Sequence, residues 1–422
     1  MYTFKIAIIG LGYVGLPLAF AFQKKYKVIG YDISKKRIDS LNNGFDETNE
    51  ITPDRFINAK NLSFSNTSSD LSDANVYIVT VPTPITESKI PDLSFLESAS
   101  LEISKYLNNG DIVIYESTVY PGATEEICVP ILEQGSSLKL NADFYIGYSP
   151  ERINPGDMSH RIEDIKKITS GSNEYSARKI DNLYDSIIDA GTHPVSSIKV
   201  AEAAKVIENV QRDLNIGLVN ELSVIFDKLK IPTHEVINAA STKWNFHKYI
   251  PGLVGGHCIG VDPYYLTFKS QSLGYTPDVI LAGRKSNEEI TNFIANKCIK
   301  TLVSRNKLNH GSKILVLGAT FKENCPDTRN SKVPELCTKI VDFGLNVDIY
   351  DPLMSQDNTN SADGRINYIN EPDGKYTAVI IAVKHNIFIE KGSQWIRNLS
   401  IKDGLIFDLK NTFPDEGDFT YL

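Results

Sequence analysis

Short apolar runs, often rich in β-branched residues, alternate with helix-like stretches through the first part of the chain. Between them, the stretch VGLPLAFAFQKK (14–25) has the character of a buried helix. Strands that alternate with helices form βαβ units on a parallel sheet. The runs expected to form strands are KIAIIG (5–10), YKVIGYDI (26–33), NVYIVTVPT (75–83), DIVIYEST (111–118) and ADFYIGYSP (142–150).

A second series of the same kind occupies the end of the chain. VIGYDIS (28–34) and VDIYDPL (347–353) both end a strand with Tyr-Asp, after an earlier strand that ends in glycine. This repetition predicts an α/β fold with two Rossmann-like, doubly wound domains. The later runs are SKILVLGATFK (312–322), LNVDIYDP (345–352), YTAVIIAVK (376–384) and GLIFDLKN (404–411).

A long helix is predicted between the two series. From Ser197 to Lys230 apolar residues recur at helical spacing without a proline. We expect this helix to connect the two domains and to form a dimer seam, and the polar segment 355–364 to be a surface loop. The expected domains are 1–196, 197–300 and 301–422, the middle one being helical.

Composition and charge narrow the class of protein. Of the 422 residues, 41% are hydrophobic and 23% charged, which is typical of a folded globular chain rather than a disordered or fibrous one. A net charge of -8 argues against a nucleic-acid partner. The start of the sequence lacks a signal-peptide pattern, and no apolar run approaches the ~20 residues of a membrane span. We expect a protein that is neither secreted nor inserted in a membrane.

The cysteines argue against structural disulfides and structural zinc. They are odd in number and form no CxxC pair. A reducing cytoplasmic location fits this usage, and no metal site is expected. The five cysteines are Cys128, Cys258, Cys298, Cys325 and Cys337.

The stretch GLGYVG has the glycine spacing of a dinucleotide-binding turn, because it follows one predicted strand and opens a helix. Gly10 permits the turn, Gly12 lets a pyrophosphate approach the backbone, and Gly15 allows close helix–strand packing. Asp32, at the end of the next strand, is placed to bind a ribose hydroxyl, which selects NAD over NADP. A Rossmann-like fold that binds no dinucleotide is the alternative.

Other cofactor contacts are expected around this turn. Lys35, Lys36 and Arg37 could instead hold a 2'-phosphate, but Asp32 would repel that phosphate. Thr83 and Thr118 follow later strands at the sheet edge where such folds bind ligands, although either could simply cap a turn. The expected cofactor contacts up to this point are Gly10, Gly12, Tyr13, Val14, Gly15, Asp32, Arg37, Thr83 and Thr118.

Cys258, in VGGHCIGVDPYY, is the candidate nucleophile. Glycines on both sides favour a loop that a ligand can approach, and Asp262 supplies a carboxylate nearby. Packing is the competing role for any free cysteine, and we assign it to the other four. His257 is interpreted as structural, and the segment offers no second thiol at metal-ligand spacing.

A thiol in a nicotinamide-dependent enzyme indicates a specific chemistry. Hydride removal from an alcohol yields an aldehyde, which a thiolate captures as a thiohemiacetal; a second hydride loss gives a thioester that water cleaves to a carboxylate. The oxygen anions that form need fixed donors. Lys205 and Asn209, four residues apart on the predicted long helix, are candidates. A solvated surface lysine is the alternative for Lys205.

Several motifs together resemble the UDP-glucose/GDP-mannose dehydrogenase family. The resemblance covers nearly the whole chain and implies NAD-dependent, four-electron oxidation of a sugar C6 hydroxyl to a carboxylate. It also implies an NAD-binding first domain, a UDP-sugar-binding third domain and a homodimer built on the long helix. The motifs are GLGYVGLP, YDIS, STVYPG, SPERINPG, AEAAKVIEN, NEL, GGHCIGVDPYYL and GATFKENCPDTRNS.

The resemblance implies roles for individual residues. Cys258 is the thioester nucleophile, Lys205 and Asn209 stabilise the oxyanions, and Asp262 with Thr118 orders the hydrolytic water. Glu151 matches the second acid of the family, so either it or Asp262 is the general base. Substrate contacts are expected from Glu151, Lys205, Asn209, Tyr249, Gly255, Phe321 and Lys322, and a further cofactor contact from Arg329.

The sequence around the thiol points to one branch of the family. UDP-glucose dehydrogenases usually read GGxCLPKD after an arginine, whereas this chain reads GGHCIGVD after STKWNFHKY. This version resembles the enzymes acting on UDP-N-acetylhexosamines, which make uronates for surface polysaccharides. UDP-N-acetylglucosamine or UDP-N-acetylgalactosamine is the first expectation; UDP-N-acetylmannosamine and UDP-glucose are alternatives. A two-electron β-hydroxyacid-type dehydrogenase and a non-catalytic nucleotide-sugar binding protein are more distant ones.

Overall fold

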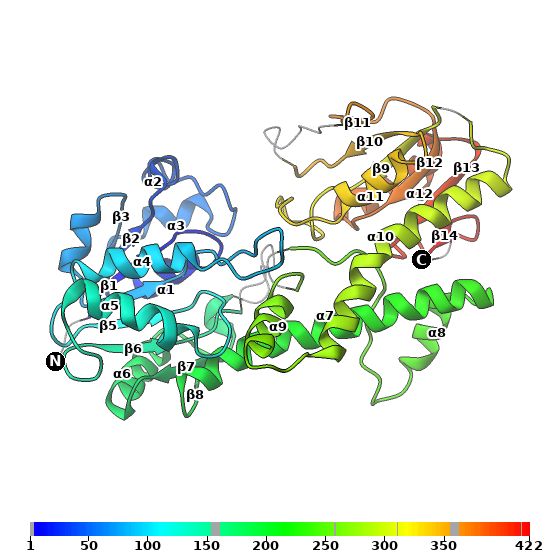
Figure 1. Ribbon diagram of the computed structural model, residues 1–422. Coiled ribbons are helices and arrows are strands. Elements are labelled where there is room, and N and C mark those ends of the chain that lie inside the picture. Colours follow the sequence, from blue (N-terminus) through cyan, green and yellow to red (C-terminus); the bar gives the residue numbers. More distant parts are fainter. Residues whose placement is uncertain (1–3, 153–160, 257–258, 310, 355–362, 415) are drawn as a thin grey trace. The chain divides into compact units, whose positions relative to one another are not determined.

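The computed structural model describes residues 4–152, 161–256, 259–309, 311–354, 363–414 and 416–422 (Figure 1). Cys258 and His257 lie outside the described residues. The chain divides into two compact units, Met1–Glu208 with Tyr264–Tyr275, and Asn209–Pro263 with Thr276–Leu422. Each unit contains one Rossmann-like sheet, so the predicted fold class is confirmed. The three-domain boundaries drawn from the sequence stay a prediction.

The sheet of the first unit has eight strands in the order β3-β2-β1-β4-β5-β6-β7-β8. Its strands run parallel except for the antiparallel pair β6 and β7. The order reverses between β1 and β4, and ligands of such sheets bind at this switch point. The strands are β1 (Lys5–Ile9), β2 (Lys27–Tyr31), β3 (Leu62–Ser65), β4 (Val76–Val79), β5 (Ile112–Tyr115), β6 (Tyr145–Tyr148), β7 (Lys167–Gly171) and β8 (Thr192–Pro194).

Helices cover this sheet, which explains why its central strands are apolar throughout. Four of the five β1 residues are buried, as are all four of β4 and of β5. Ile6 and Ile8 share a core with Leu16 and Phe20 of α1. The helical segments are α1 (Gly15–Phe22), α2 (Lys35–Asn42), α3 (Pro53–Ile57), η1 (Ser68–Asp73), α4 (Ser94–Ser104), η2 (Thr124–Cys128, a π-helical turn), α5 (Val129–Ser136), η3 (Ile162–Asp164) and α6 (Glu174–Asp185).

The sheet of the second unit has six parallel strands in the order β11-β10-β9-β12-β13-β14. Side chains of β9 alternate between two cores: Ile314 and Val316 pack in one, Leu315 and Leu317 in the other. The elements are β9 (Lys313–Leu317), α11 (Val333–Val341), β10 (Asn346–Tyr350), β11 (Ile366–Tyr368), β12 (Tyr376–Ile381), α12 (Asn386–Leu399), β13 (Ser400–Asp408) and β14 (Thr420–Tyr421).

In the described part of the chain, four helices lie between the two sheets in the sequence. They are α7 (Ile198–Leu229), α8 (Thr233–Ala240), α9 (Asp262–Ser272) and α10 (Asp278–Ser304). The 32-residue α7 confirms the predicted long helix. Among the residues that the structure describes, no helix is both long enough and apolar enough to span a bilayer.

Candidate active site

The glycine-rich turn joins β1 to α1. Gly10 has a φ of +93°, a left-handed conformation that favours glycine. A Cβ on Gly15 would lie 1.9 Å from the carbonyl oxygen of Gly10, so a larger residue would push the helix away from the strand. A Cβ on Gly12 would meet no atom within 4 Å. The turn therefore has the open backbone that a dinucleotide needs, and Tyr13 and Val14 lie half-buried within it.

The acid at the end of β2 holds this turn. One oxygen of Asp32 accepts the Leu11 N–H at 2.9 Å, and the other accepts the Ser34 N–H at 2.9 Å. Arg37 is buried; its Nε donates to the Leu11 carbonyl at 2.9 Å, and its guanidinium pairs with Asp46 at 2.8 Å. Arg37 thus supports the turn from within the protein, and a direct contact with the cofactor stays a prediction.

The loops after β4 and β5 are tied together at the same edge of the sheet. The Ser117 hydroxyl donates to the Val81 carbonyl at 2.7 Å, beside the half-buried Thr118. The Tyr265 hydroxyl donates to the Thr83 carbonyl at 2.9 Å. The two threonines expected at the site, Thr83 and Thr118, therefore lie in loops whose backbone is fixed by side-chain hydrogen bonds.

Glu151 and Lys205, separated by 54 residues, form an ion pair with 2.5 Å between Oε1 and Nζ. Lys205 is 1% exposed and Glu151 8%. Arg152 donates to the Lys205 carbonyl at 2.8 Å and pairs with Glu208. Two of the predicted catalytic residues are thus in contact, and Lys205 is not the solvated surface lysine that was the alternative.

A second buried ion pair in the first unit contacts the residue that precedes Glu151. Lys167 Nζ lies 2.6 Å from Glu116 and donates to the Pro150 carbonyl at 3.1 Å. The Tyr184 hydroxyl donates to the other oxygen of Glu116, and burial raises the pKa of Tyr184 well above its usual range. Because Pro150 immediately precedes Glu151, this cluster fixes the backbone that carries the expected base.

Sequence reasoning missed Glu116 and Lys167. Glu116 directly follows β5, whose four residues are all buried, and Lys167 is the first residue of β7; the two charged residues are 0% and 4% exposed. A buried charge needs a partner of opposite charge, since removing one ion from water costs on the order of several kcal/mol. For Glu116, the available signal was an acid placed directly after an apolar strand.

In the second unit, Asn209 and Asp262 are in contact. Asn209 Nδ2 donates to Asp262 Oδ2 at 2.5 Å, and both side chains are almost fully buried. Asp262 is the first residue of α9, and Asn209 lies on α7, one helical turn after Lys205. Residues 53 apart in the sequence are thus paired, and their catalytic roles stay a prediction.

The segment before Cys258 packs against the loop after β9. Gly256 has a φ of +86° and donates its N–H to the Asn330 carbonyl at 3.2 Å. A Cβ on Gly256 would lie 2.6 Å from the Phe321 ring, and one on Gly255 would lie 2.5 Å from the Asn330 oxygen. These glycines therefore permit a close backbone approach between two segments expected to bind substrate. Tyr249 lies half-buried earlier in the same segment.

The loop after β9 carries the remaining predicted contacts. Lys322 is half-buried, and Arg329 is exposed and forms a bidentate pair with Asp327, with NH2 2.7 Å from Oδ2. Asp351, at the end of β10, accepts the Ala319 N–H at 2.7 Å. This repeats the way in which the aspartate after β2 holds the first turn.

A buried histidine completes this second turn. His385 Nδ1 accepts the Asn324 N–H at 2.9 Å, so Nε2 is the atom that faces Asp351, at 3.1 Å. Burial acts to raise the pKa of Asp351, but the hydrogen bond from His385 and those from backbone N–H groups outweigh it, and that pKa is lowered. The Asp351 carboxylate is therefore the stable form within the fold.

Four cysteines are fully buried, which confirms their predicted packing role: Cys128, Cys298, Cys325 and Cys337. Burial raises the pKa of Cys128 and that of Cys298 to about 12. The thiols of Cys128 and Cys298 are therefore protonated at neutral pH, so they do not compete with Cys258 as nucleophiles.

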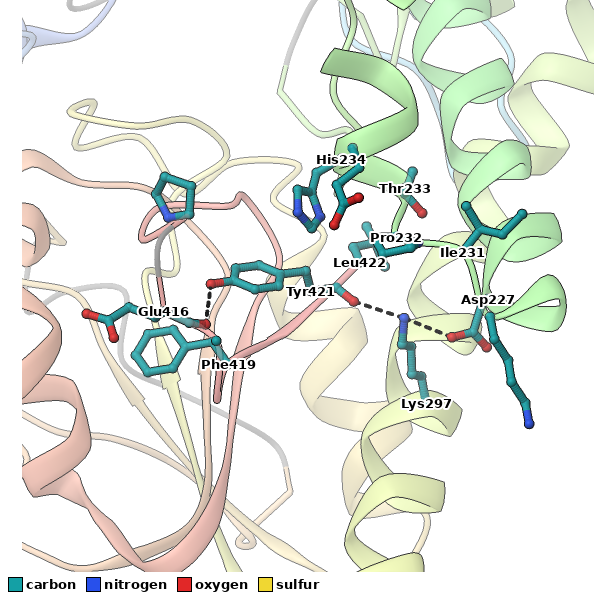
Figure 2. A pocket seen from close by; sticks show the side chains of 14 residues that line it. Asp227, Ile231, Pro232, Thr233, His234, Lys297, Glu416, Phe419, Tyr421 and Leu422 are labelled. Atoms are coloured by element: carbon teal, nitrogen blue, oxygen red, sulfur yellow. Dashed lines mark hydrogen bonds and ion pairs between the residues drawn. The ribbon is translucent and has the colours of Figure 1, made fainter. Parts of the chain in front are cut away.

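A surface pocket of about 550 Å³ lies in the second unit (Figure 2). In it Lys297 pairs with Asp227 at 2.9 Å and donates to the Tyr421 carbonyl at 2.9 Å, while the His234 ring lies 5.4 Å from that of Tyr421. Its lining carries both charges, and Lys297 is already paired with Asp227. Its described lining includes none of the residues predicted for the site.

Fold and site together define an α/β oxidoreductase with a dinucleotide-binding turn and a second Rossmann-like domain. The chain matches three models of one family, described as the NAD binding domain (residues 4–188), the central domain (199–289) and the UDP binding domain (315–415). It belongs to the UDP-glucose/GDP-mannose dehydrogenase family and is an NAD-dependent nucleotide-sugar dehydrogenase.

Individual relatives match over nearly their whole length. The UDP-N-acetyl-D-glucosamine 6-dehydrogenase of Pseudomonas aeruginosa is 52% identical, covering 99% of each chain. The enzyme of the same name from Salmonella typhi is 52% identical over 98% of this chain and 97% of its own. A solved structure of the UDP-D-ManNAc dehydrogenase of Pyrococcus horikoshii has a TM-score of 0.86 at 30% identity and covers 99% of this chain and 98% of its own.

Proposed function

We propose that this chain oxidises the C6 hydroxyl of UDP-N-acetyl-D-glucosamine to a carboxylate, in two steps that each reduce one NAD. The observation that carries the substrate is the 52% identity, along 99% of both chains, to an enzyme named for that sugar. UDP-N-acetyl-D-mannosamine is the second candidate, because enzymes named for it are 30–32% identical over at least 96% of this chain. The uronate product is of the kind that surface polysaccharides contain.

The chain has residues suited to hold NAD, which accepts the hydride in each oxidation. The open turn at Gly12 and the carboxylate of Asp32 fit its pyrophosphate and ribose. In the first oxidation, C6 loses a hydride to NAD and its hydroxyl loses a proton to water, leaving an aldehyde. The buried cation of Lys205 stabilises negative charge that develops on the C6 oxygen.

The thiol makes the second oxidation possible. The thiolate of Cys258 adds to the aldehyde carbon, and the alkoxide that forms is stabilised by Lys205 and Asn209. Collapse of this thiohemiacetal with loss of the second hydride leaves a thioester. Water then adds to the thioester carbon, and a carboxylate, Glu151 or Asp262, takes the water proton. The C–S bond breaks, which releases the uronate and regenerates the thiolate.

The stoichiometry of NADH tests this function. We expect two NADH, followed by absorbance, for each UDP-N-acetyl-D-glucosamine consumed, and a uronate by mass spectrometry. One NADH per sugar would show a two-electron enzyme, and no NADH with any UDP-sugar of a panel of UDP-glucose and the three UDP-N-acetylhexosamines would show a binding protein. Faster turnover of UDP-N-acetyl-D-mannosamine than of the glucosamine would overturn the substrate assignment.

Replacing the thiol tests the covalent step separately. Cys258→Ser should lose carboxylate formation by a factor of about 10³ or more while it still binds NAD. The matched control is Cys298→Ala, which removes a thiol from a buried position on α10 that no step uses. Wild-type uronate production by Cys258→Ser would remove the thioester from the proposal.

We also propose a homodimer and a cytoplasmic location. Five exposed apolar residues on α7 fall within about 40° of one another around an ideal helix, in a stripe of Val200, Ile207, Leu218, Ile225 and Leu229. These side chains are 43–60% exposed, and a second copy of the same helix would bury them. A reactive free thiol fits a reducing compartment.

A further inference from the structure

Asn220 of α7 holds the backbone of the segment that leads to the thiol. It is 1% exposed, and its Oδ1 accepts the Gly252 N–H at 2.8 Å while its Nδ2 donates to the Gly252 carbonyl at 3.1 Å. Gly252 lies outside any helix or strand, so its backbone groups have no partner from regular secondary structure. The side-chain amide of Asn220 therefore replaces the neighbouring strand that would otherwise satisfy them.

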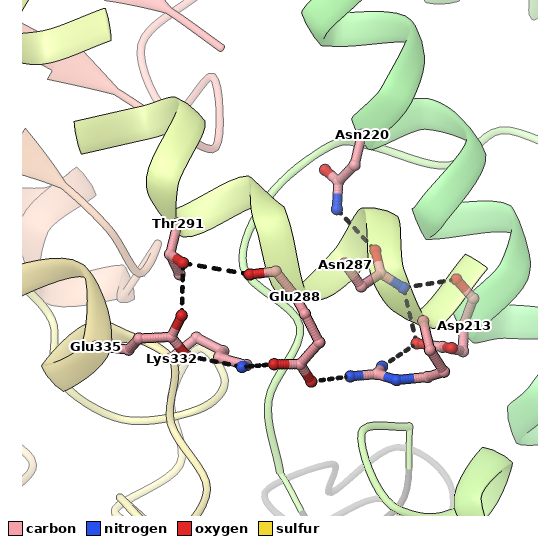
Figure 3. Close-up of polar contacts among 8 residues, drawn as sticks. Asp213, Asn220, Asn287, Glu288, Thr291, Lys332 and Glu335 are labelled. Carbon is pink, nitrogen blue, oxygen red and sulfur yellow. Dashed lines mark hydrogen bonds and ion pairs between the residues drawn. The ribbon is translucent and has the colours of Figure 1, made fainter. Parts of the chain in front are cut away.

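Asn220 is itself fixed by a buried polar network within the second unit (Figure 3). Its Nδ2 also donates to Asn287 Oδ1 at 2.8 Å. Asn287 Nδ2 donates to the carboxylate of Asp213 at 2.7 Å, and Arg284 donates to the same carboxylate oxygen at 2.5 Å. Asn287 and Asp213 are fully buried, so a broken link would leave an unsatisfied polar group inside the protein.

The network continues to the loop after β9. Arg284 pairs with Glu288, and Glu288 pairs with Lys332, where that loop ends (Figure 3). Lys332 also lies 2.8 Å from Glu335, which accepts the Thr291 hydroxyl at 2.6 Å. One polar framework on α7 and α10 thus reaches both segments that carry expected substrate contacts.

The two segments also meet directly. The Gly256 N–H donates to the Asn330 carbonyl at 3.2 Å, so the segment before the thiol is held at Gly252 by α7 and at Gly256 by the loop after β9. Two anchors four residues apart leave little freedom to the backbone between them. The residues that follow include Cys258, whose position the chemistry depends on.

We propose that Asn220 is a positioning residue for the reaction. By holding the backbone of Gly252, it sets the position of the segment that leads to Cys258 relative to the UDP-sugar. The inference rests on the function proposed above. It gives Asn220 no contact with substrate, cofactor or reacting atoms. A displacement of the thiol by about 1 Å would cost roughly 10²-fold in the covalent step, because that step needs near-contact geometry.

Asn220→Ala tests the inference. We expect kcat/KM for the UDP-sugar to fall by about 10²-fold, while the Kd for NAD, whose expected contacts around the glycine turn lie in the other unit, stays within about twofold of wild type. Asn296→Ala is the matched control, because Asn296 is exposed on α10 and its amide donates to the Asn292 carbonyl one turn earlier. A loss of NAD affinity as large as the loss in kcat/KM for the UDP-sugar would indicate general damage to the fold and overturn the positioning role.

A readout without substrate separates this inference from the proposed function. The other four cysteines are buried, so iodoacetamide in the folded protein should label Cys258, followed by peptide mass spectrometry. We expect the labelling rate to rise about three- to tenfold in Asn220→Ala, since the segment loses one anchor. Wild-type labelling together with wild-type kcat/KM would refute the role of Asn220 even if the enzyme turns over as proposed.

The labelling also remains informative if no UDP-sugar is oxidised, since it reads the position of the thiol alone. Asn220→Ser is the second variant in case the alanine protein fails to fold. Its hydroxyl keeps a polar group on α7 but is too short to hold both backbone atoms of Gly252, so the same two changes are expected. Unchanged values in the serine variant would count against the inference.

Discussion

At the scale of single residues, the buried charges of the site are paired with opposite charges. Lys205 is held by Glu151, and Lys167 by Glu116, all inside the first unit. Removing one member of a buried pair leaves an uncompensated charge and costs about 3–5 kcal/mol. Such pairs seldom add stability over apolar packing, so Lys205 and Glu151 are better explained by chemistry than by folding.

Asp111, just before β5, is a buried acid whose effect on stability depends on pH. It is 3% exposed, and it accepts the Asn108 N–H at 2.8 Å. Burial raises the pKa of this carboxyl from 3.8 to about 6. Because the folded-state pKa is the higher one, the protonated acid favours the folded state; that contribution is complete below pH 3.8 and is lost as the pH rises through about 6.

Asp111→Asn should therefore gain stability relative to wild type as the pH rises. We expect the difference in Tm, variant minus wild type, to increase between pH 4 and about 7 and to level off above it. Any fixed cost of the amide shifts this curve without changing its shape. Asp39→Asn, at an exposed position on α2, is the control, and a difference between wild type and Asp111→Asn that is the same at pH 4 and pH 7 would contradict the assignment.

At the scale of elements, α7 and α10 cross at two glycines. A Cβ on Gly217 of α7 would lie 2.8 Å from the Gly283 carbonyl oxygen of α10, and one on Gly283 would lie 2.4 Å from the Leu214 side chain. The backbones of the two helices can approach this closely because neither position carries a side chain. The crossing brings Asp213 and Asn220 of α7 within reach of Asn287 of α10.

Gly217→Ala should destabilise the protein although alanine is the better helix former. Helix propensity would favour the variant by about 1 kcal/mol, but overpacking against backbone costs about 1–3 kcal/mol and cannot be relieved by a rotamer change. The net cost is up to about 2 kcal/mol, so we expect Tm to fall by up to about 8 °C in calorimetry. Asn292→Ala, exposed on α10, should leave Tm unchanged, and a Tm for Gly217→Ala at or above wild type would show that the helices move apart freely.

At the scale of the whole molecule, the apolar stripe on α7 makes the oligomeric state testable. Leu218→Asp places a charge in the middle of the stripe, so light scattering should report 47.0 kDa per particle rather than twice that mass. Ile57→Asp is the matched control, since Ile57 is an 80% exposed isoleucine on α3, away from the stripe. A wild-type protein that is already monomeric would overturn the dimer.

Much of the architecture followed from local pattern. The strand runs, the glycine turn and the long helix were predicted because apolar spacing and glycine placement act over a few residues. Glu151 and Lys205 were named separately, but nothing in their spacing requires that they touch. Glu116 and Asn220 were missed, because an acid at the end of a strand and an asparagine on a helix are common, and their partners lie 51 and 32 residues away.

The amino-acid sequence by itself determined the two Rossmann-like domains, the dinucleotide turn and the family, because each depends on residue types at short, fixed intervals. Only the tertiary structure decided which buried polar group meets which: Lys167 with Glu116, Asn220 with Gly252. Those pairings depend on how elements pack, and packing at a crossing such as Gly217 against Gly283 is a property of two distant segments together. The spacing of residues within one segment cannot determine this packing.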